Sequence, residues 1–203
     1  MANSRKLVAC MAELTGHPLS RVVGHMRSLR EAEPSLVTNK GRGITAPQMT
    51  PADAAALLCA IYASPNLQES ASTILELKKL EARRQGKKRA TRYESVGYHL
   101  PQLTLGLERD HSVIEGLAAA IAFFTKEDEL RFDYNAWRGR GKKSGIYANF
   151  EVRSPEYSAS LTFGVHGSFS EEWIYGRRGQ LDSTRIGLCT EVTLRKIAAC
   201  LKA

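Results

Sequence analysis

Apolar residues recur at helical spacing in two short stretches near the start of the chain. The spacing predicts one helix beginning at residue 7 and a second over about residues 19–32. Gly16-His17-Pro18 lies between them; glycine can end a helix in the left-handed conformation, and proline fits the first turn of the next. The patterns are carried by Leu7, Val8, Met11, Ala12 and Leu14, and then by Val22, Val23, Met26 and Leu29. This order is typical of a helix-turn-helix unit.

A third helix has a strong start signal at residues 50–53. Thr50 can cap it, Pro51 fits its first position, and Asp53 can complete a capping box. The residues that follow, AAALLCAIYAS, are apolar almost all round a helix, so this helix should be buried and end near Ser64. We expect it to pack under the first two helices, complete a three-helix core and carry no chemistry.

The remainder of the chain predicts a further helix pair and a sheet. A helix over 70–85 should lead, at Gly86, into a basic linker, and Ser112 with Glu115 marks the capping box of a helix over 113–124. Strands are predicted over 146–152, 157–165, 172–175 and 183–188, and a helix over 194–202. The strands should form an antiparallel meander whose apolar face the last helix covers.

The expected fold class is therefore α+β. An N-terminal helical (winged) helix-turn-helix domain is followed by a domain with an antiparallel β-meander and flanking helices. We place the divisions at 1–68 for the helix-turn-helix domain, 69–95 for a basic helix and linker, and 96–203 for the α+β domain. The wing is predicted from the basic glycine loop NKGRG at 39–43, for which a plain solvated loop is the alternative.

Composition adds a preference for an anionic partner. The 203-residue chain has a formal net charge of +8 and a pI near 9.5, which suits a polyanion such as nucleic acid. No stretch is apolar for long enough to span a bilayer and no secretory signal is evident, so a cytoplasmic protein is expected. The four cysteines form no CxxC pair, which favours buried free thiols over disulfides or zinc.

The candidate DNA-binding residues lie on the second helix and the loop after it. Arginine can pair with guanine edges or phosphates, and serine with either. An ordinary helical hairpin with a solvated basic face is the alternative interpretation. The residues proposed to contact DNA are Ser20, Arg21, His25, Arg27 and Ser28 on the helix, beside Arg30, and Lys40 and Arg42 on the loop.

The order of the helix pair, the KGRG loop and APQMTPADAAALLCAI resembles the N-terminal region of phage- and prophage-associated bacterial helix-turn-helix regulators. The resemblance covers about the first third of the chain. It implies DNA binding through Ser20, Arg21, His25 and Arg27, with Lys40 and Arg42 as wing-like contacts. A homodimer is expected, because one short recognition helix reads few base pairs.

Chemistry of other kinds has little support in the sequence. The loop RGRGKKSG at 138–145 lacks the glycine spacing and the Ser or Thr of a P-loop, and the five histidines are scattered. We therefore expect no enzyme, no cofactor and no metal site. The expected function is a sequence-specific transcriptional regulator that binds double-stranded DNA, with a protein partner on its C-terminal domain. The alternatives are an adaptor or inhibitor that docks on an acidic protein and a DNA-packaging recognition subunit.

Overall fold

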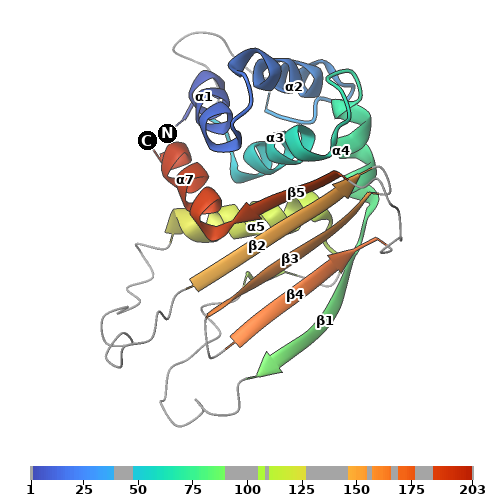
Figure 1. Cartoon of the computed structure of the whole chain (residues 1–203), viewed down its shortest axis with the longest axis vertical. Helices are drawn as coiled ribbons and strands as arrows, with labels where there is room; N and C mark the ends of the chain where they lie inside the picture. Colours follow the sequence, from blue (N-terminus) through green and yellow to red (C-terminus); the bar gives the residue numbers. More distant parts are fainter. Residues whose placement is uncertain are drawn as a thin grey trace.

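The computed structural model describes residues 2–38, 48–89, 105–107, 110–126, 146–154, 157–165, 169–176 and 185–202. The chain is α+β, as predicted (Figure 1). Its helices are α1 (Ser4–Thr15), α2 (Leu19–Glu31), α3 (Pro51–Ala63), α4 (Ser70–Lys79), α5 (Val113–Lys126) and α7 (Glu191–Lys202). Its strands are β1 (Ala82–Arg89), β2 (Ile146–Ser154), β3 (Ser158–Val165), β4 (Phe169–Tyr175) and β5 (Arg185–Thr190).

The helix ends follow the local signals in the sequence. Gly16 ends α1 with φ +68°, a conformation that costs glycine little and lets α2 begin three residues later. The predicted capping box of α3 is confirmed, with Thr50 Oγ1 accepting from Asp53 N at 3.2 Å and Asp53 Oδ2 accepting from Thr50 N at 2.7 Å. Local capping chemistry therefore sets the start of α3.

The box predicted for α5 is also confirmed. Glu115 Oε2 accepts from Ser112 N at 2.7 Å, and Ser112 Oγ accepts from Glu115 N at 3.4 Å. These two bonds satisfy amides that have no partner inside the helix.

The sheet has five antiparallel strands in the order β1-β4-β3-β2-β5. The predicted meander is confirmed for β2, β3 and β4, but β5 does not continue it. Instead β5 pairs with β2, for example Cys189 opposite Phe150. Its buried side packs on α3, where the side chain of Tyr62 lies against Gly187. Contact with a helix from early in the sequence thus decides the position of β5.

The prediction of a helix over 70–85 followed by a linker is wrong in its second half. Helix α4 ends at Lys79, and β1 then pairs with β4 and forms one edge of the sheet. Charged residues at 82–89 hid this strand, because sequence periodicity detects a strand mainly through alternating burial. The free backbone groups of β4 provide the reason for pairing, since they need partners whatever the side chains are.

One face of the sheet carries the apolar core. Buried residues of β2, β3 and β4 include Phe150, Phe163 and Trp173. A layer that contains α3, α5 and α7 covers this side of the sheet (Figure 1). The rings of Phe123 on α5 and Phe163 on β3 lie 4.7 Å apart, edge to face. Helix α7 contacts β2 and β5 as expected, but it also packs along α1 and α5.

Helix α3 occupies the centre of the molecule. It packs on α2 as predicted, and also on α4, α5, β5 and β2. Apolar side chains from α1, α3, the sheet and α7 belong to one connected buried cluster, which runs across the border predicted near residue 68. The division at 1–68, 69–95 and 96–203 stays a prediction from composition.

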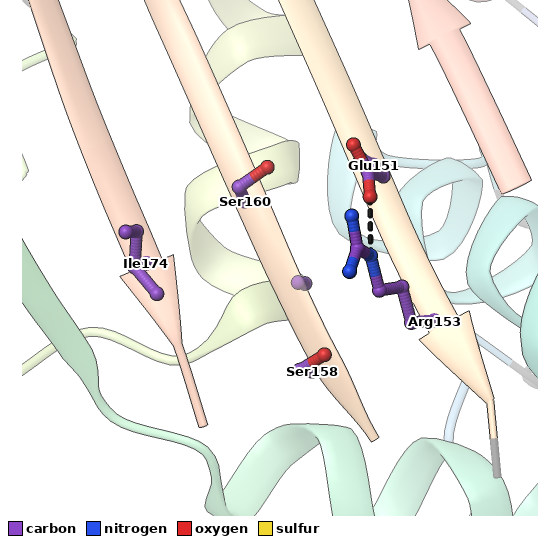
Figure 2. A pocket seen from close by; sticks show the side chains of 6 residues that line it. Glu151, Arg153, Ser158, Ser160 and Ile174 are labelled. Atoms are coloured by element: carbon purple, nitrogen blue, oxygen red, sulfur yellow. Dashed lines mark hydrogen bonds and ion pairs between the residues drawn. The ribbon is translucent and has the colours of Figure 1, made fainter. Parts of the chain in front are cut away.

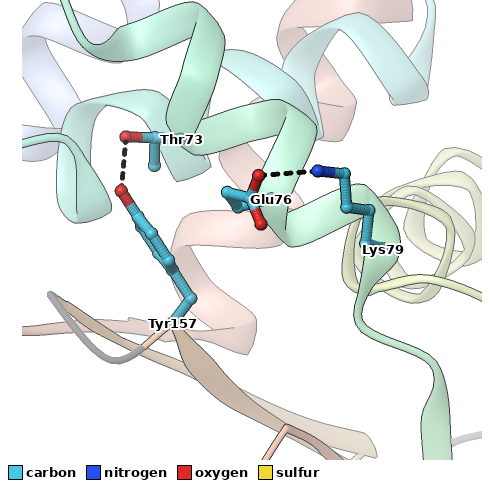
Figure 3. Close-up of polar contacts among 4 residues, drawn as sticks. All are labelled: Thr73, Glu76, Lys79 and Tyr157. Carbon is cyan, nitrogen blue, oxygen red and sulfur yellow. Dashed lines mark hydrogen bonds and ion pairs between the residues drawn. The ribbon is translucent and has the colours of Figure 1, made fainter.

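A polar contact also joins the sheet to the helices. Tyr157, at the start of β3, extends its hydroxyl to within 3.3 Å of Thr73 Oγ1 on α4 (Figure 3). Tyr157 has φ +38°, an uncommon conformation for a residue with a side chain. On the exposed side of α4, Glu76 and Lys79 form an ion pair at 2.7 Å (Figure 3). The Tyr157 contact fixes α4 above the β2–β3 end of the sheet.

Candidate nucleic-acid interface

The inner side of α2 holds the helix in the molecule. Val22, Met26 and Leu29 are buried at the helical spacing that the sequence predicts. Val23 belongs to the same predicted apolar set, but it is 48% exposed, because one residue along a helix turns the side chain by about 100°. The assignment of Val23 to the inner side is therefore wrong.

His25 is also on the inner side, and its predicted place on the DNA-binding face is wrong. The side chain is 0% exposed, and its Nδ1 lies 2.8 Å from Ser70 Oγ at the start of α4. Its spacing from Val22 and Leu29 is the signal that could have placed it inside. A buried imidazole cannot reach a base edge without unpacking α2 from α4.

The hydrogen bonds around His25 define its tautomer. Ser70 Oγ donates its one proton to the carbonyl of Leu67 at 2.8 Å, so it must accept from Nδ1–H of His25. His25 Nε2 is then unprotonated, and it has no hydrogen-bond partner among the described residues. Burial, with the charge of Arg21 and with His17, lowers the pKa of His25 from 6.5 to about 4.

The outer face of α2 is the surface that remains for a partner. We use this name for the five exposed residues Leu19, Ser20, Val23, Arg27 and Glu31. The side chain of Arg27 is 75% exposed, and its Nε donates to Glu31 Oε1 at 2.7 Å. This ion pair raises the pKa of Arg27 further and is easily broken, because both groups are in water. Arg27 can therefore exchange Glu31 for a phosphate.

The other predicted contact residues lie at the borders of this face. Arg21, Ser28 and Arg30 are all partly exposed, so α2 presents them beside the outer face rather than on it. Lys40 and Arg42, with the whole predicted wing, lie outside the described residues. The described chain therefore brings together Ser20, Arg21, Arg27, Ser28 and Arg30 on one helix.

Two features of α2 were not predicted from the sequence. Leu19 is 54% exposed, and with Val23 one turn later it forms an apolar strip on the outer face. The N-terminus of α2 carries no side-chain cap, so the amides of its first two residues, Leu19 and Ser20, have no partner inside the helix. Amides at a helix N-terminus attract anions, which adds to the electrostatic attraction of this end.

A second cluster of positive charge lies in the sheet. Strand β1, ARRQGKKR, has basic residues at five of its eight positions and forms an edge of the sheet. The sequence predicted that these basic residues lie at the end of a helix and in a linker. They lie instead on an edge strand of the sheet. Basic residues at 78 and 79, at the end of α4, are thus followed, after residues 80–82, by those at 83, 84 and 87–89 on the sheet edge.

The polar face of the sheet has a small recess at the end of β2 and the start of β3 (Figure 2). Glu151 and Arg153, two residues apart on β2, form an ion pair along one side of it (Figure 2). Ser158, Ala159, Ser160 and Ile174 complete the lining. The guanidinium and carboxylate neutralise one another, so the recess offers hydroxyl groups and a paired charge rather than a nucleophile beside a base.

A buried polar contact lies beneath the other face of the sheet. His111 Nε2 is 2.8 Å from Tyr175 Oη, and the ring of His111 stands edge-on to Trp173 at 4.7 Å. Gly116 on α5 leaves the room for the Tyr175 hydroxyl, because a Cβ there would overlap it. Burial raises the pKa of Tyr175 far above its usual range. These residues join α5 to β4 without access to solvent.

The described residues form no metal-binding cluster and no membrane-spanning helix. In the ranges that the structure describes, no three His, Cys, Asp or Glu side chains are grouped as metal ligands. None of the described helices combines the length and apolar character needed to cross a bilayer. The cysteines do come together in space, with Cys10 beside Cys200 and Cys59 near Cys189.

Comparison with known proteins adds no relative. No protein-family model matches the sequence, and no curated protein or solved structure has significant similarity to it. The resemblance of the N-terminal third to phage-type regulators therefore stays a prediction from its residues.

Proposed function

We propose that this protein binds double-stranded DNA through the outer face of α2, as a transcriptional regulator of phage type. The observation that carries the proposal is the division of α2. Its apolar side packs on the core through Val22, Met26 and Leu29, while Ser20 and Arg27 face outward after the tight turn at Gly16. A helix held in this way can lie in a major groove and present those side chains to base edges.

The electrostatics support a nucleic-acid partner. The chain carries a net charge of +8, and the uncapped N-terminus of α2 adds its positive dipole end to the two arginines, Arg21 and Arg27. Phosphates would replace Glu31 as the partner of Arg27 and release counterions, which is the main source of affinity in such complexes. His25 has no contact role in this proposal and instead anchors the helix to α4.

Binding assays over a salt series test the proposal. We expect fluorescence-labelled duplexes taken from the genomic DNA that flanks the gene for this protein to bind more tightly than shuffled duplexes of equal length. The double variant Arg21→Ala/Arg27→Ala should lose at least about tenfold in affinity and lower the salt slope by roughly two. Arg5→Ala, an exposed arginine on α1, is the charge-matched control and should bind nearly like the wild type. Equal affinities for the wild type and the double variant at every salt concentration would refute the proposal.

A second candidate is favoured by the apolar strip. Leu19 and Val23 are exposed on the outer face of α2, and apolar side chains bind the core of a protein interface better than a DNA groove. An adaptor function would use this strip with Arg27 at its rim, on an acidic protein. The variant Leu19→Ser/Val23→Ser separates the two candidates. If the protein is an adaptor, the variant should abolish capture of a protein partner after nuclease treatment. If it binds DNA, the variant should leave the salt dependence of DNA binding unchanged.

A further inference from the structure

Helices α1 and α7 pack side by side, although they are far apart in the sequence (Figure 1). A backbone hydrogen bond from Ala2 N to the carbonyl of Leu201, at 3.2 Å, fixes their relative position. Each helix carries one cysteine at this contact, Cys10 on α1 and Cys200 on α7, and both side chains are partly exposed. The pair is therefore held by tertiary structure and open to solvent.

The two sulfur atoms face the same turn of α1. Cys200 Sγ lies 3.8 Å from the carbonyl oxygen of Lys6. In an α-helix that carbonyl accepts the amide proton of the residue four positions later, which is Cys10. The Cα–Cβ bond of Cys10 leans toward the N-terminus of α1, and so toward Lys6. The two cysteine side chains are accordingly neighbours across the α1–α7 contact.

We propose that Cys10 and Cys200 are a modification site, at which a small-molecule disulfide oxidises the two thiols to a disulfide that joins α1 to α7. The Cys200 thiol loses its proton to solvent, and its thiolate attacks one sulfur of the oxidant and displaces a thiolate. Cys10 Sγ, after losing its own proton, attacks Cys200 Sγ in the mixed disulfide and displaces the second thiolate. The protein loses two protons and two electrons, and the oxidant becomes two thiols.

The surroundings of Cys10 explain this order of attack. Burial and the neighbouring Cys200 raise the pKa of Cys10 to about 12, which disfavours its thiolate as the first nucleophile. Lys196, one turn before Cys200, acts in the opposite direction on the pKa of Cys10. A thiol that is hard to ionise is also a poor leaving group in exchange, so the disulfide should form slowly and persist.

The second cysteine pair provides a matched control inside the same chain. Cys59 on α3 and Cys189 on β5 are also near one another, but both are buried in the core. Burial raises the pKa of Cys189 to about 12. An oxidant in solution cannot reach these sulfur atoms while the protein is folded. Oxidation should therefore link Cys10 to Cys200 and leave Cys59 and Cys189 as free thiols.

Oxidised glutathione added to the folded, reduced chain tests the proposal. We expect a mass loss of about 2 Da and, after alkylation and digestion, a Cys10–Cys200 cross-linked peptide that dithiothreitol releases. Tm should rise by roughly 5–15 °C, because the bond closes a loop of nearly the whole chain. Cys10→Ser and Cys200→Ser should each abolish the cross-link and the rise in Tm, and Cys59→Ala should keep both.

Three results would overturn the proposal. One is a peptide map in which Cys10 and Cys200 stay unlinked after prolonged oxidation. Another is a stable mixed disulfide between glutathione and Cys200, from which Cys10 fails to displace the glutathione. The third is a cross-link that involves Cys59 or Cys189. Peptide mapping of the wild type alone decides among these outcomes, whatever the serine variants do to folding, and none of them depends on DNA binding.

Discussion

Helices α2 and α3 each have 13 residues, but they use their surfaces in opposite ways. Ten residues of α3 are buried, whereas four of α2 are, and one of those four is a histidine. A helix that is covered on all sides can only support the fold. A helix that is covered on one side can also meet a partner, which is why the candidate interface belongs to α2.

The comparison also separates two ways of holding a helix. Helix α3 begins at a capping box and is surrounded by apolar side chains. Helix α2 has no side-chain cap and depends on three apolar residues and on the hydrogen bond between His25 and Ser70. Lowering the pH should therefore weaken the attachment of α2, whereas α3 should be sensitive to substitutions that leave a cavity in the core.

Shortening a leucine inside α3 should have the largest effect. Leu57→Ala removes a fully buried side chain from the centre of the core, and we expect it to lower the free energy of unfolding by about 2–5 kcal/mol. Urea denaturation measures this loss. Leu19→Ala makes the same change on the outer face of α2 and should cost less than about 0.5 kcal/mol. Similar losses for the two variants would remove the contrast between the helices.

Removing the carboxylate of Asp53 should come next. Asp53 is buried and accepts from the backbone amide and hydroxyl of both Thr38 and Thr50, at 2.7–2.9 Å. We expect Asp53→Ala to cost about 2–4 kcal/mol, because four donors lose their acceptor. Glu115→Ala removes the matching acid from the exposed box of α5, and about 1 kcal/mol or less is expected there. A larger loss at Glu115 would show that capping, rather than burial, governs both sites.

The pH dependence of stability tests how α2 is held. Because the pKa of His25 is about 4 in the folded chain and near 6.5 when unfolded, the unfolded state binds more protons between these values. The contribution of the neutral His25 ring to the free energy of unfolding should therefore be fully present above pH 6.5. It should fall by up to about 3 kcal/mol as the pH decreases to 4.

Urea melts at several pH values measure this slope. His25→Gln should flatten it, while His17→Gln, on a partly exposed histidine at the turn, should change it less. A wild-type slope that survives in His25→Gln would assign the effect to other groups.

Arg27→Ala should have the smallest effect on folding. Its ion pair with Glu31 lies in water on the outer face, where pairs of this kind contribute little. We expect Tm to change by less than about 1 °C in differential scanning calorimetry. The same variant should weaken DNA binding measurably, so a change in Tm without a change in binding would contradict the proposed function of this face.

Local signals in the sequence predicted most of the helices and four of the five strands that the structure describes. The start of α3 follows from Thr50-Pro51-Ala52-Asp53, the end of α1 from Gly16, and the start of α5 from Ser112 and Glu115. These devices act over three or four residues, so they are visible in the chain itself. The alternation of Ala159, Leu161 and Phe163 likewise predicted the buried face of β3.

Contacts between distant segments decided the rest. Strand β1 forms because β4 offers it a row of backbone partners, and β5 crosses to β2 because α3 receives its buried side. Helical spacing puts His25 on the inner side of α2, and Ser70, 45 residues later, gives the buried ring its hydrogen-bond partner. Cys10 meets Cys200 only through the packing of α1 on α7. The sequence by itself determined where the helices begin and, apart from β1, which segments become strands, since capping and periodicity are local. Which polar residues face solvent was decided by the tertiary structure, because burial depends on what packs against each element.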